Sequence, residues 1–348
     1  MKFNSYLAEA ASPPPWRAYR SAPLLRDSFA RTFNYLRLSI TDRCNFRCEY
    51  CLPNGYQAKA ESVAELSRQE IHRLVRGFAT LGLTKVRLTG GEPSLRKDLC
   101  AIIADIATIP SVKTIALSTN GYRLARDLQN WASAGLSAVN VSIDSLDPIR
   151  FAKMTGSDSL PQILKGVQQT VDAGLLQVKI NAVLNANTDT SEILRFIEFV
   201  KQQDVTVRFI ELMETSNAKQ YFESNRQSSA RLVQYLQQNG WTQMVRADNA
   251  GPAIEFQHRD SVGRIGVIAP YAGGFCDTCN RLRVSAQGRL HTCLFASNSY
   301  SLRELLQHDA QQAALQQRLA ELTALKTAGH QLHAGATGIN NGFSHIGG

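Results

Sequence analysis

The stretch TDRCNFRCEYC at residues 41–51 places three cysteines, Cys44, Cys48 and Cys51, within eight positions. Their spacing is C-x3-C-x2-C. A disulfide needs paired cysteines, and neighbours as close as these would close strained small loops. Three thiolates in one loop suit a 4Fe–4S cluster in which one iron has no protein ligand. Structural zinc with a distant fourth ligand stays open as the alternative, although zinc sites usually begin with one C-x2-C pair and end with another.

Strands and helices alternate along the chain on both sides of this loop. The expected strands lie at residues 35–41, 85–91, 112–121, 138–144, 177–184 and 205–213, and turns close the second and third. The expected helices lie at residues 67–82, 96–108, 123–135, 160–174 and 190–203. Three of these helices end at a glycine, which is a common stop signal. Alternation at this spacing predicts parallel strands joined by right-handed crossovers.

Polar residues or glycines follow the carboxyl end of every expected strand. They are Asp42, Gly90–Gly91, Asn120, Asp144, Asn185 and Glu214. Loops that converge on one mouth are how a barrel builds its site. No G-x-G-x-x-G follows the first strand, which disfavours a dinucleotide-binding open sheet. We therefore expect an α/β fold, an incomplete (βα)6 barrel of the TIM type, followed by a C-terminal α+β extension.

The pattern changes after about residue 240, where turn glycines and short β runs begin. Cys276, Cys279 and Cys293 have the spacing C-x2-C-x13-C, and residues 279–295 predict a hairpin that turns at AQG. This set again leaves one ligand position empty. A zinc ribbon with His291 as the fourth ligand is the alternative to a cluster.

Three domains are expected from these boundaries. Residues 1–30 form a leader, residues 31–240 the partial barrel, and residues 241–348 an extension that ends in a Gly-Gly tail. Within the extension, residues 302–327 are expected to be helical. The glycine-rich tail at 335–348 has the composition of a frayed terminus.

Composition restricts the partners and the compartment. The chain has 348 residues, 44% of them hydrophobic, and a net charge of +9, which suggests a polyanionic partner. The basic residues are scattered, which disfavours a nucleic-acid-binding stripe. No apolar run approaches the length of a membrane span, and no signal-peptide pattern is present. Two odd-numbered cysteine sets suit a reducing compartment, so we expect a cytoplasmic protein and leave open an organelle leader at residues 1–24. The lone Cys100 is interpreted as a small buried hydrophobe.

Basic residues also occur inside the apolar strand runs. Arg37, Arg87, Lys179 and Arg208 each lie two to five residues before the end of an expected strand. An inward-facing cation is costly there unless an anion pairs with it. One such residue could belong to a structural ion pair, but four on four strands predict an anionic ligand inside the barrel.

The first cysteine set and the sequence TGGEP at residues 89–93, in this order, resemble the radical S-adenosylmethionine (SAM) superfamily. The resemblance implies that the open iron chelates the methionine part of SAM, and that the reduced cluster splits SAM into methionine and a 5′-deoxyadenosyl radical. The glycine backbone of TGGEP is then expected to approach the methionine amino group closely.

Further motifs resemble the GTP 3′,8-cyclase family of molybdenum-cofactor biosynthesis, from about residue 25 to the end of the chain. They are YLRLSITDRCNFRCEYCLP, KVRLTGGEPSLR, STNGYRL, VNVSIDSLD, RFIELME, FCDTCNRLRVS, LHTCLF and the terminal IGG. The resemblance implies a second 4Fe–4S cluster on Cys276, Cys279 and Cys293, with its open iron at the guanine of GTP. It implies that the radical takes hydrogen from C3′ of the ribose, and that C3′ then attacks C8 of guanine. The expected product is (8S)-3′,8-cyclo-7,8-dihydroguanosine 5′-triphosphate.

The resemblance also assigns the other site residues. The positions that match SAM-binding residues are Tyr50, Gly91, Ser142 and Met213. The positions that match GTP-binding residues are Arg37, Arg87, Ser118, Lys179, Arg208, Arg281 and Arg283. Arg281 and Arg283 alternate along a strand and so share one face, where two guanidinium groups suit a triphosphate. No side chain is assigned as an acid, a base or a nucleophile.

The partners implied are GTP, a low-potential electron donor such as flavodoxin, and the next pathway enzyme, to which the product is handed over. A homodimer is left open, and neither nucleic acid nor a membrane is expected. Two other functions stay open. One is a different radical SAM reaction with an auxiliary cluster, such as peptide modification, which the basic barrel interior disfavours. The other is a non-catalytic zinc protein that binds nucleotides or RNA. Metal content separates it from the cluster enzyme, which holds about eight irons per chain.

Overall fold

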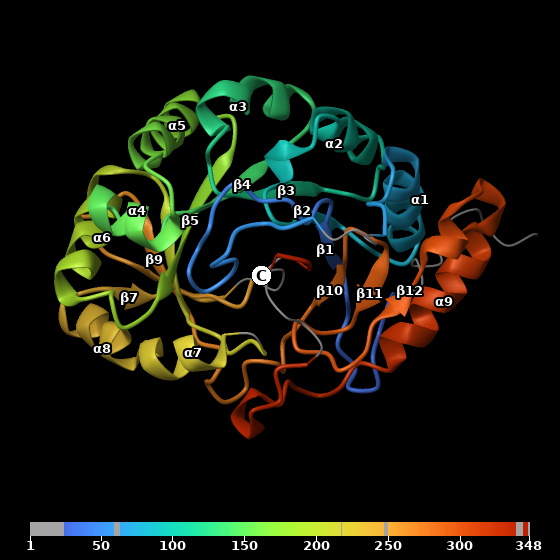
Figure 1. Ribbon diagram of the computed structural model, residues 1–348. Coiled ribbons are helices and arrows are strands. Elements are labelled where there is room, and N and C mark those ends of the chain that lie inside the picture. The colour runs from blue at the N-terminus through green and yellow to red at the C-terminus, as the bar shows by residue number, and fades with distance from the viewer. Residues whose placement is uncertain (1–23, 59–62, 217, 247–249, 339–343, 347–348) are drawn as a thin grey trace, which may run out of the picture.

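A ring of parallel strands surrounds the centre of the molecule in this computed structural model (Figure 1). The structure describes residues 24–58, 63–216, 218–246, 250–338 and 344–346. Most of the expected leader and the final Gly347–Gly348 pair lie outside these residues. The six expected strands are present as β1 (Tyr35–Ser39), β2 (Lys85–Thr89), β3 (Thr114–Thr119), β4 (Ala138–Ser142), β5 (Gln177–Leu184) and β6 (Thr206–Glu211). They pair in chain order and in parallel, which confirms the incomplete (βα)6 barrel.

The expected crossover helices cover the outside of this ring (Figure 1). They are α1 (Arg68–Ala79), α2 (Leu99–Ala107), α3 (Leu124–Ser133), α5 (Leu160–Ala173) and α6 (Thr190–Gln202). The start of α1 follows from its sequence, because Ser67 and Glu70 form a capping box that satisfies two backbone donors. The end of α5 follows too, because Gly174 adopts a left-handed conformation with φ of 61°.

Three further helices were not expected. They are α4 (Pro148–Thr155), α7 (Lys219–Asn225) and α8 (Ala230–Gln238). Helix α4 carries clear local signals, because Asp147 accepts hydrogen bonds from two backbone amides of the first turn and Gly156 ends the helix in a left-handed conformation.

The C-terminal strands extend the barrel sheet at both of its edges. They are β7 (Thr242–Gln243), β8 (Ile254–Gln257), β9 (Arg264–Ile268), β10 (Arg281–Val284), β11 (Arg289–His291) and β12 (Tyr300–Ser301). Strand β9 pairs in parallel with β6, and β10 pairs in parallel with β1. The expected hairpin is present as β10 and β11, with Gly288 in the turn. The extension therefore adds to the barrel wall at both edges.

The expected helical stretch at 302–327 consists of short 3-10 turns followed by α9 (Gln312–Ala324). Helix α9 packs on α1 so closely that a Cβ on Gly77 would lie 2.5 Å from Leu315 Cδ2. This contact anchors the C-terminal extension to the outside of the barrel.

The alternation along β1 divides the molecule into a helix-facing core and a polar interior. Leu36 and Leu38 are fully buried in the hydrophobic core between strands and helices. Tyr35 and Arg37 lie on the other face and line the interior of the barrel. The same division holds for β2, so the arginines expected to point inward do so.

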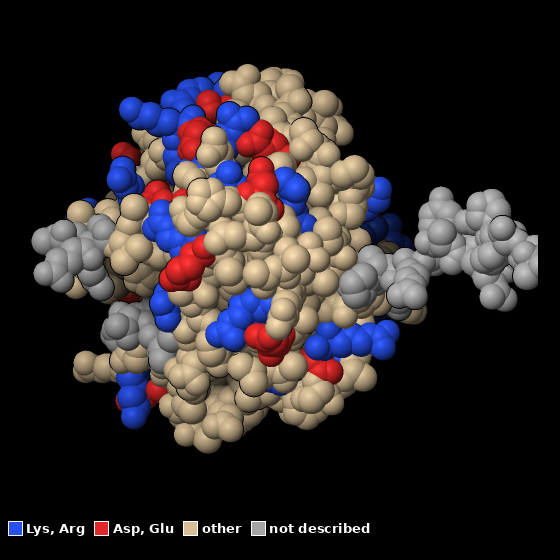
Figure 2. All heavy atoms as spheres, turned by 90° about the vertical axis from the view of Figure 1, so that its right-hand side faces the viewer, with Lys and Arg blue, Asp and Glu red and all other residues tan. Residues whose placement is uncertain are grey.

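The outer surface that carries α1 and α9 shows positive and negative side chains intermingled (Figure 2). Ion pairs on this side join Arg68 to Asp105 and Arg73 to Asp309. Within the described part of the chain, no helix is both long and apolar enough to span a membrane.

Candidate active site

The strand register brings basic side chains from separate strands next to one another inside the barrel. Arg37 of β1 lies beside Arg87 of β2 on one side and Arg283 of β10 on the other. Two residues earlier on the same strands, Tyr35 lies between Lys85 and Arg281. Two adjacent rows of cations therefore run across three neighbouring strands.

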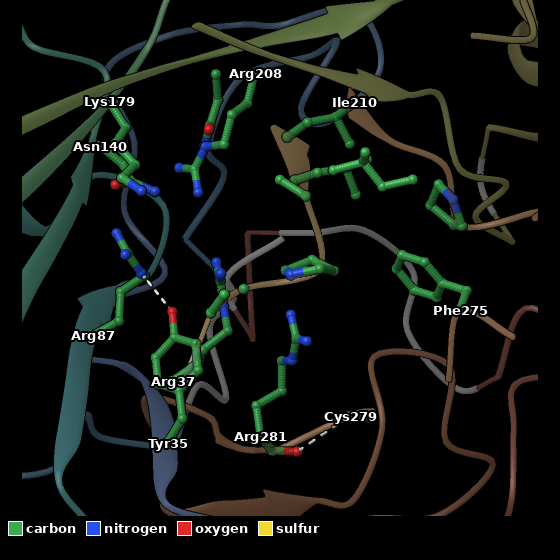
Figure 3. Close-up of a pocket in the computed structure, with 18 of the residues that line it drawn as sticks. Tyr35, Arg37, Arg87, Asn140, Lys179, Arg208, Ile210, Phe275, Cys279 and Arg281 are labelled. Atoms are coloured by element: carbon green, nitrogen blue, oxygen red, sulfur yellow. Dashed lines mark hydrogen bonds between the residues drawn. The ribbon is translucent and has the colours of Figure 1, made fainter. Parts of the chain in front are cut away.

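These rows line a cavity of about 700 Å³, which is within the usual size of a small-molecule site (Figure 3). Its basic lining residues are Arg37, Lys85, Arg87, Lys179, Arg208, Arg246, Arg264, Arg281, Arg283 and Lys326. Glu255 is the single carboxylate among the described residues that line it. This imbalance favours a polyanionic ligand in the cavity.

The structure places most of the predicted site residues on this cavity and leaves others at the barrel mouth. Those that line the cavity are Arg37, Arg87, Lys179, Arg208, Met213, Cys276, Cys279, Arg281, Arg283 and Cys293. Those that do not line it are Cys44, Cys48, Tyr50, Cys51, Gly91, Ser118 and Ser142. Ser118 nevertheless contacts the set, because Arg87 Nη1 donates to its hydroxyl at 3.4 Å.

Several lining residues were missed by the sequence analysis. Tyr35 and Lys85 each lie two positions before a predicted arginine on the same strand, so the period of two could have found them. Arg264 and Lys326 had no such signal, because their segments were not assigned to the barrel wall.

Burial lowers the pKa values of several cavity arginines. Burial, opposed in part by the charge of Tyr35, lowers the pKa of Arg37 to about 10. Burial and the charge of Arg87 lower the pKa of Arg208 to about 9. Burial and neighbouring arginines hold the pKa of Arg283 well below its usual value. An anionic ligand would raise these pKa values again, because it stabilises the protonated arginines. The same stabilisation contributes favourably to the free energy of ligand binding.

Arg208 is well placed to meet such a ligand. Its Nε and that of Arg281 are buried and find no hydrogen-bond acceptor among the described residues. Gly266 on β9 makes room for it, since a Cβ there would lie 2.8 Å from Arg208 Cγ. Buried donors normally find acceptors, so these atoms mark positions for ligand oxygens.

The first cysteine set lies in the loop after β1, at the mouth of the barrel. Burial raises the pKa of Cys44 to about 11 and that of Cys48 well above its usual value, with Asp144, Cys51 and Cys44 adding to the effect on Cys48. The Cys51 amide donates to the carbonyl of Cys48 at 3.0 Å, so a tight turn brings these two cysteines together. Among the described residues, no set of three or more Cys, His, Asp or Glu side chains closes on one point where a single metal ion would be held. Three neighbouring thiols with one position open fit a 4Fe–4S cube, which is larger than a single ion.

The glycines of TGGEP pack against this cysteine loop. A Cβ on Gly90 would lie 2.2 Å from the carbonyl oxygen of Thr41, and one on Gly91 would lie 2.3 Å from that of Arg43. Glu92 is fully buried and accepts hydrogen bonds from Ser94 N at 2.9 Å and from Asn120 N at 2.6 Å. The motif therefore holds the loop in place, which is a physical reason for the glycines besides the expected approach to SAM.

The Gly91→Ala variant is expected to fold with a loosened cysteine loop. The overlap with Arg43 involves backbone, which cannot move aside cheaply, so we expect a cost of about 1–3 kcal/mol. Iron per chain after reconstitution and the thermal midpoint measure the effect. The matched control is Gly273→Ala, where a Cβ meets nothing within 4 Å. Equal iron loading of both variants would contradict the packing role.

The other residues matched to SAM gather at the same mouth. Tyr50 donates from its hydroxyl to Asp144 Oδ2 at 2.8 Å, and Val183 N donates to the other oxygen at 2.8 Å. Burial raises the pKa of Asp144 to about 6. Ser142 ends β4 beside the cavity-lining Asn181 of β5. The mouth thus opens onto the cation-lined cavity.

The second cysteine set lines the opposite part of the cavity. Burial raises the pKa of the Cys279 thiol, but the charges of Lys326 and Arg281 outweigh burial and lower it. The Lys326 ammonium donates to the carbonyl of Thr292, and Arg31 Nη1 donates to the carbonyl of Cys276 at 3.0 Å. These cations favour the thiolate form of Cys279, whereas burial outweighs Lys326 at Cys276 and raises the pKa of that thiol.

His291, the alternative zinc ligand, is paired in register with Arg283 on the neighbouring strand. Burial and the charge of Arg283 lower its pKa to about 4, so the ring is neutral near pH 7. No described group that includes it is arranged around a single metal position. The zinc-ribbon alternative therefore gains no support from the geometry.

The last described residues of the chain lie inside the ring of strands (Figure 1). Ile346 is 1% exposed, and its carbonyl accepts a hydrogen bond from Arg283 Nη1 at 3.2 Å. His345 Nδ1 lies 3.5 Å from Asp42 Oδ1 at the barrel mouth. This part of the tail is ordered against the cavity, unlike the frayed terminus that its composition allowed.

Comparisons with known proteins agree with this geometry. The model of the radical SAM superfamily matches residues 38–200, and a model described as Molybdenum Cofactor Synthesis C matches residues 205–332. A GTP 3′,8-cyclase of Shewanella denitrificans is 48% identical over 96% of this chain and 99% of its own length. A GTP 3′,8-cyclase of Cronobacter sakazakii is 48% identical over 94% of this chain and 100% of its own length. The structure of Streptococcus suis SuiB bound to S-adenosylmethionine shares the fold, with a TM-score of 0.59 and 13% identity, covering 82% of this chain and 68% of that one.

Proposed function

The chain belongs to the GTP 3′,8-cyclase family of radical SAM proteins, and on this premise we propose that it converts GTP to (8S)-3′,8-cyclo-7,8-dihydroguanosine 5′-triphosphate. This reaction is the first step of molybdenum cofactor biosynthesis, in agreement with the second family model. The observation that carries the proposal is the cation-lined cavity, whose wall includes the second set of three cysteines. A polyanionic nucleotide placed there would reach from one set towards the other.

The first cysteine set would hold a 4Fe–4S cluster with SAM on its open iron. Cys44, Cys48 and Cys51 supply the thiolates, and the TGGEP motif fixes their loop. When bound, the cluster and SAM supply the acceptor for the hydrogen atom of C3′. Tyr50, Gly91, Ser142 and Met213 would position SAM, because they lie at the mouth or on the adjoining cavity wall.

The second cysteine set would hold a second 4Fe–4S cluster that meets the guanine. Cys276, Cys279 and Cys293 line the cavity, so a cluster on them would face the substrate directly. The nearby cations Lys326 and Arg31 lower the pKa of the Cys279 thiol and would offset part of the negative charge of a thiolate-bound cluster. The protein itself would position the nucleotide and exclude water from the reacting carbon.

The basic side chains between the two sets would bind the triphosphate. The cavity is lined by Arg37, Arg87, Lys179 and Arg208 of the barrel strands and by Arg281 of β10 (Figure 3). Arg283 of β10 lines the same cavity. Lys179 now pairs with Glu255 at 3.4 Å and would exchange that carboxylate for a phosphate. Ser118 supports Arg87 through its hydroxyl.

Replacing Arg281, Arg283 or Lys179 by alanine is expected to lower the affinity for GTP more than the affinity for guanosine. A charge-assisted hydrogen bond contributes about 1.5–3 kcal/mol, so each substitution should lower the affinity for GTP roughly 10- to 150-fold. Calorimetric affinities for GTP and guanosine, without SAM or reductant, measure it. Arg259→Ala is the matched control, because that side chain is 88% exposed and does not line the cavity. Equal losses for both ligands would remove these residues from the phosphate site.

The function itself is tested by one anaerobic reaction. Reconstituted protein is incubated with SAM, dithionite and GTP, and 5′-deoxyadenosine and the cyclised nucleotide are quantified. We expect both products, and about eight irons per chain if each cysteine set holds a 4Fe–4S cluster. Protein that contains only zinc and forms neither product would favour a nucleotide-binding zinc protein. A low-potential donor such as flavodoxin would replace dithionite in the cell.

A further inference from the structure

Tyr35 places a buried phenol at the centre of the cation cluster. No role has been assigned to this side chain so far. It is 6% exposed and begins strand β1 on the inward face. Its hydroxyl oxygen accepts a hydrogen bond from Arg87 Nε at 2.6 Å (Figure 3). The Lys85 ammonium lies 5.1 Å from the centre of its ring. The oxygen therefore already occupies a position where a cation cluster binds an anion.

The charged groups around this oxygen are nearly all positive, whichever element they come from. Arg37 stands on the same strand, Lys85 and Arg87 on β2, Arg281 and Arg283 on β10, and Arg208 on β6. The nearest residues of β3 on the cavity side, Thr114 and Ser118, are neutral. Glu255 of β8 is the single carboxylate among the described lining residues, and it pairs with Lys179.

This environment changes the protonation of the phenol. Burial on its own raises the pKa of Tyr35, but the charges of Arg87, Arg37 and Lys85 and the hydrogen bond from Arg87 outweigh burial and lower it to about 6. A free tyrosine has a pKa of about 10. Near pH 7 the side chain in this structure is therefore a phenolate, which partly neutralises the arginines.

We propose that Tyr35 is a resident counter-anion of the polyphosphate site, which holds the arginines together in the empty cavity and takes up a proton when the triphosphate of a nucleotide arrives. The proton comes from solvent and converts the phenolate to a phenol, with no other bond made or broken. The incoming phosphate oxygens take over the hydrogen bonds of Arg87 and Arg37, and their negative charge makes a second anion beside them unfavourable. The neutral hydroxyl then becomes a donor to a phosphate oxygen. The identity of the nucleotide rests on the proposed function; the proton uptake does not.

The proposal makes nucleotide binding dependent on pH, with a definite sign. Between about pH 6 and 8 the empty site lacks the proton that the occupied site carries, so affinity falls as pH rises, by up to about tenfold per pH unit for one proton. The Tyr35→Phe variant keeps the ring and loses the titrating oxygen. We therefore expect its affinity to be much less dependent on pH in this range.

The direct test observes the phenol by NMR in reconstituted, anaerobic protein labelled with 13C at the ring carbon that carries the tyrosine hydroxyl. The Tyr35 signal is assigned by its absence from the Tyr35→Phe spectrum. At neutral pH without ligand it is expected at the phenolate position. Saturating inorganic tripolyphosphate, or GTP without SAM and reductant, should move it to the phenol position. Guanosine, which has no phosphate, should leave it unchanged.

Two results would overturn the proposal. One is a Tyr35 signal already at the phenol position in the ligand-free protein at neutral pH, which a titration of the unmodified protein reveals without any variant. The other is a phenolate signal that stays unchanged under saturating tripolyphosphate. Failure of the proposed function looks different, because the phenol would respond to tripolyphosphate while the enzyme forms no cyclised product from GTP.

Discussion

The Cys48→Ala variant is expected to lose all reductive cleavage of SAM, whereas Cys279→Ala should keep part of it and lose the cyclised product. Cys48 lies in the loop at the barrel mouth, where three neighbouring sulfurs stand beside the TGGEP motif. Removing one thiolate leaves two protein ligands for a cluster that needs three to keep its open iron. Cys279 lines the cavity on the other side, next to Arg281, so its loss affects the substrate.

Anaerobic assays of 5′-deoxyadenosine and cyclised product separate these outcomes, with iron content measured for each variant. Cys100→Ala is the matched control, since this half-buried cysteine of α2 belongs to neither set. It should behave as the unmodified protein does. If Cys279→Ala lost SAM cleavage as completely as Cys48→Ala while its first cluster stayed fully loaded, the division of roles between the two sets would be wrong.

The barrel could be predicted because its signals are local. Each strand of the ring carries its own apolar run. Four of the five crossover helices have a side-chain cap or a glycine stop close in sequence, and α2 is the exception. The inward direction of Arg37 and Arg87 followed from the period of two alone. Helix α4 was missed although Asp147, Pro148 and Gly156 mark its ends, so that error came from an unused signal.

The pairing of the C-terminal strands with the two edges of the barrel sheet could not be predicted from local signals. Strands β9 and β10 pair with β6 and β1, and β10 is more than 200 residues from its partner along the chain. The apolar run at 264–268 indicates a strand, but nothing in its sequence indicates which strand it pairs with. This pairing is what brings Arg264, Arg281 and Arg283 into the cavity. The electrostatics of Tyr35 depend on the same long-range register.

The two cation rows also explain why the barrel interior tolerates so many charges. Buried arginines without acceptors are costly, and here the cost is offset in part by the Tyr35 oxygen, the Ser118 hydroxyl and the carbonyl of Ile346. The hydroxyl and the carbonyl are neutral acceptors, and a ligand oxygen could replace any of the three. A site built this way is ordered before the substrate arrives and still has unsatisfied donors to offer it.

Removal of Gly347 and Gly348 is expected to leave folding, iron loading and SAM binding intact and to abolish most productive chemistry on GTP. The pair follows directly on Ile346, which is buried against the cavity and accepts a hydrogen bond from Arg283. Glycine has no side chain to obstruct a filled cavity, although ordering it costs more entropy than ordering any other residue.

The measurement is cyclised product per 5′-deoxyadenosine, for full-length and truncated protein side by side. Misplacement of a substrate by about 1 Å can cost about 100-fold in rate, so a fall in the ratio of that order is expected if the tail helps to position GTP. His345→Ala is the matched control, because that side chain is 45% exposed and leaves the backbone of the tail in place. SAM would still be cleaved by the truncated protein, since the first cysteine set lies in a different loop. An unchanged ratio and rate after truncation would show that the buried contact of Ile346 with Arg283 suffices, and that the final glycines have no part in the reaction.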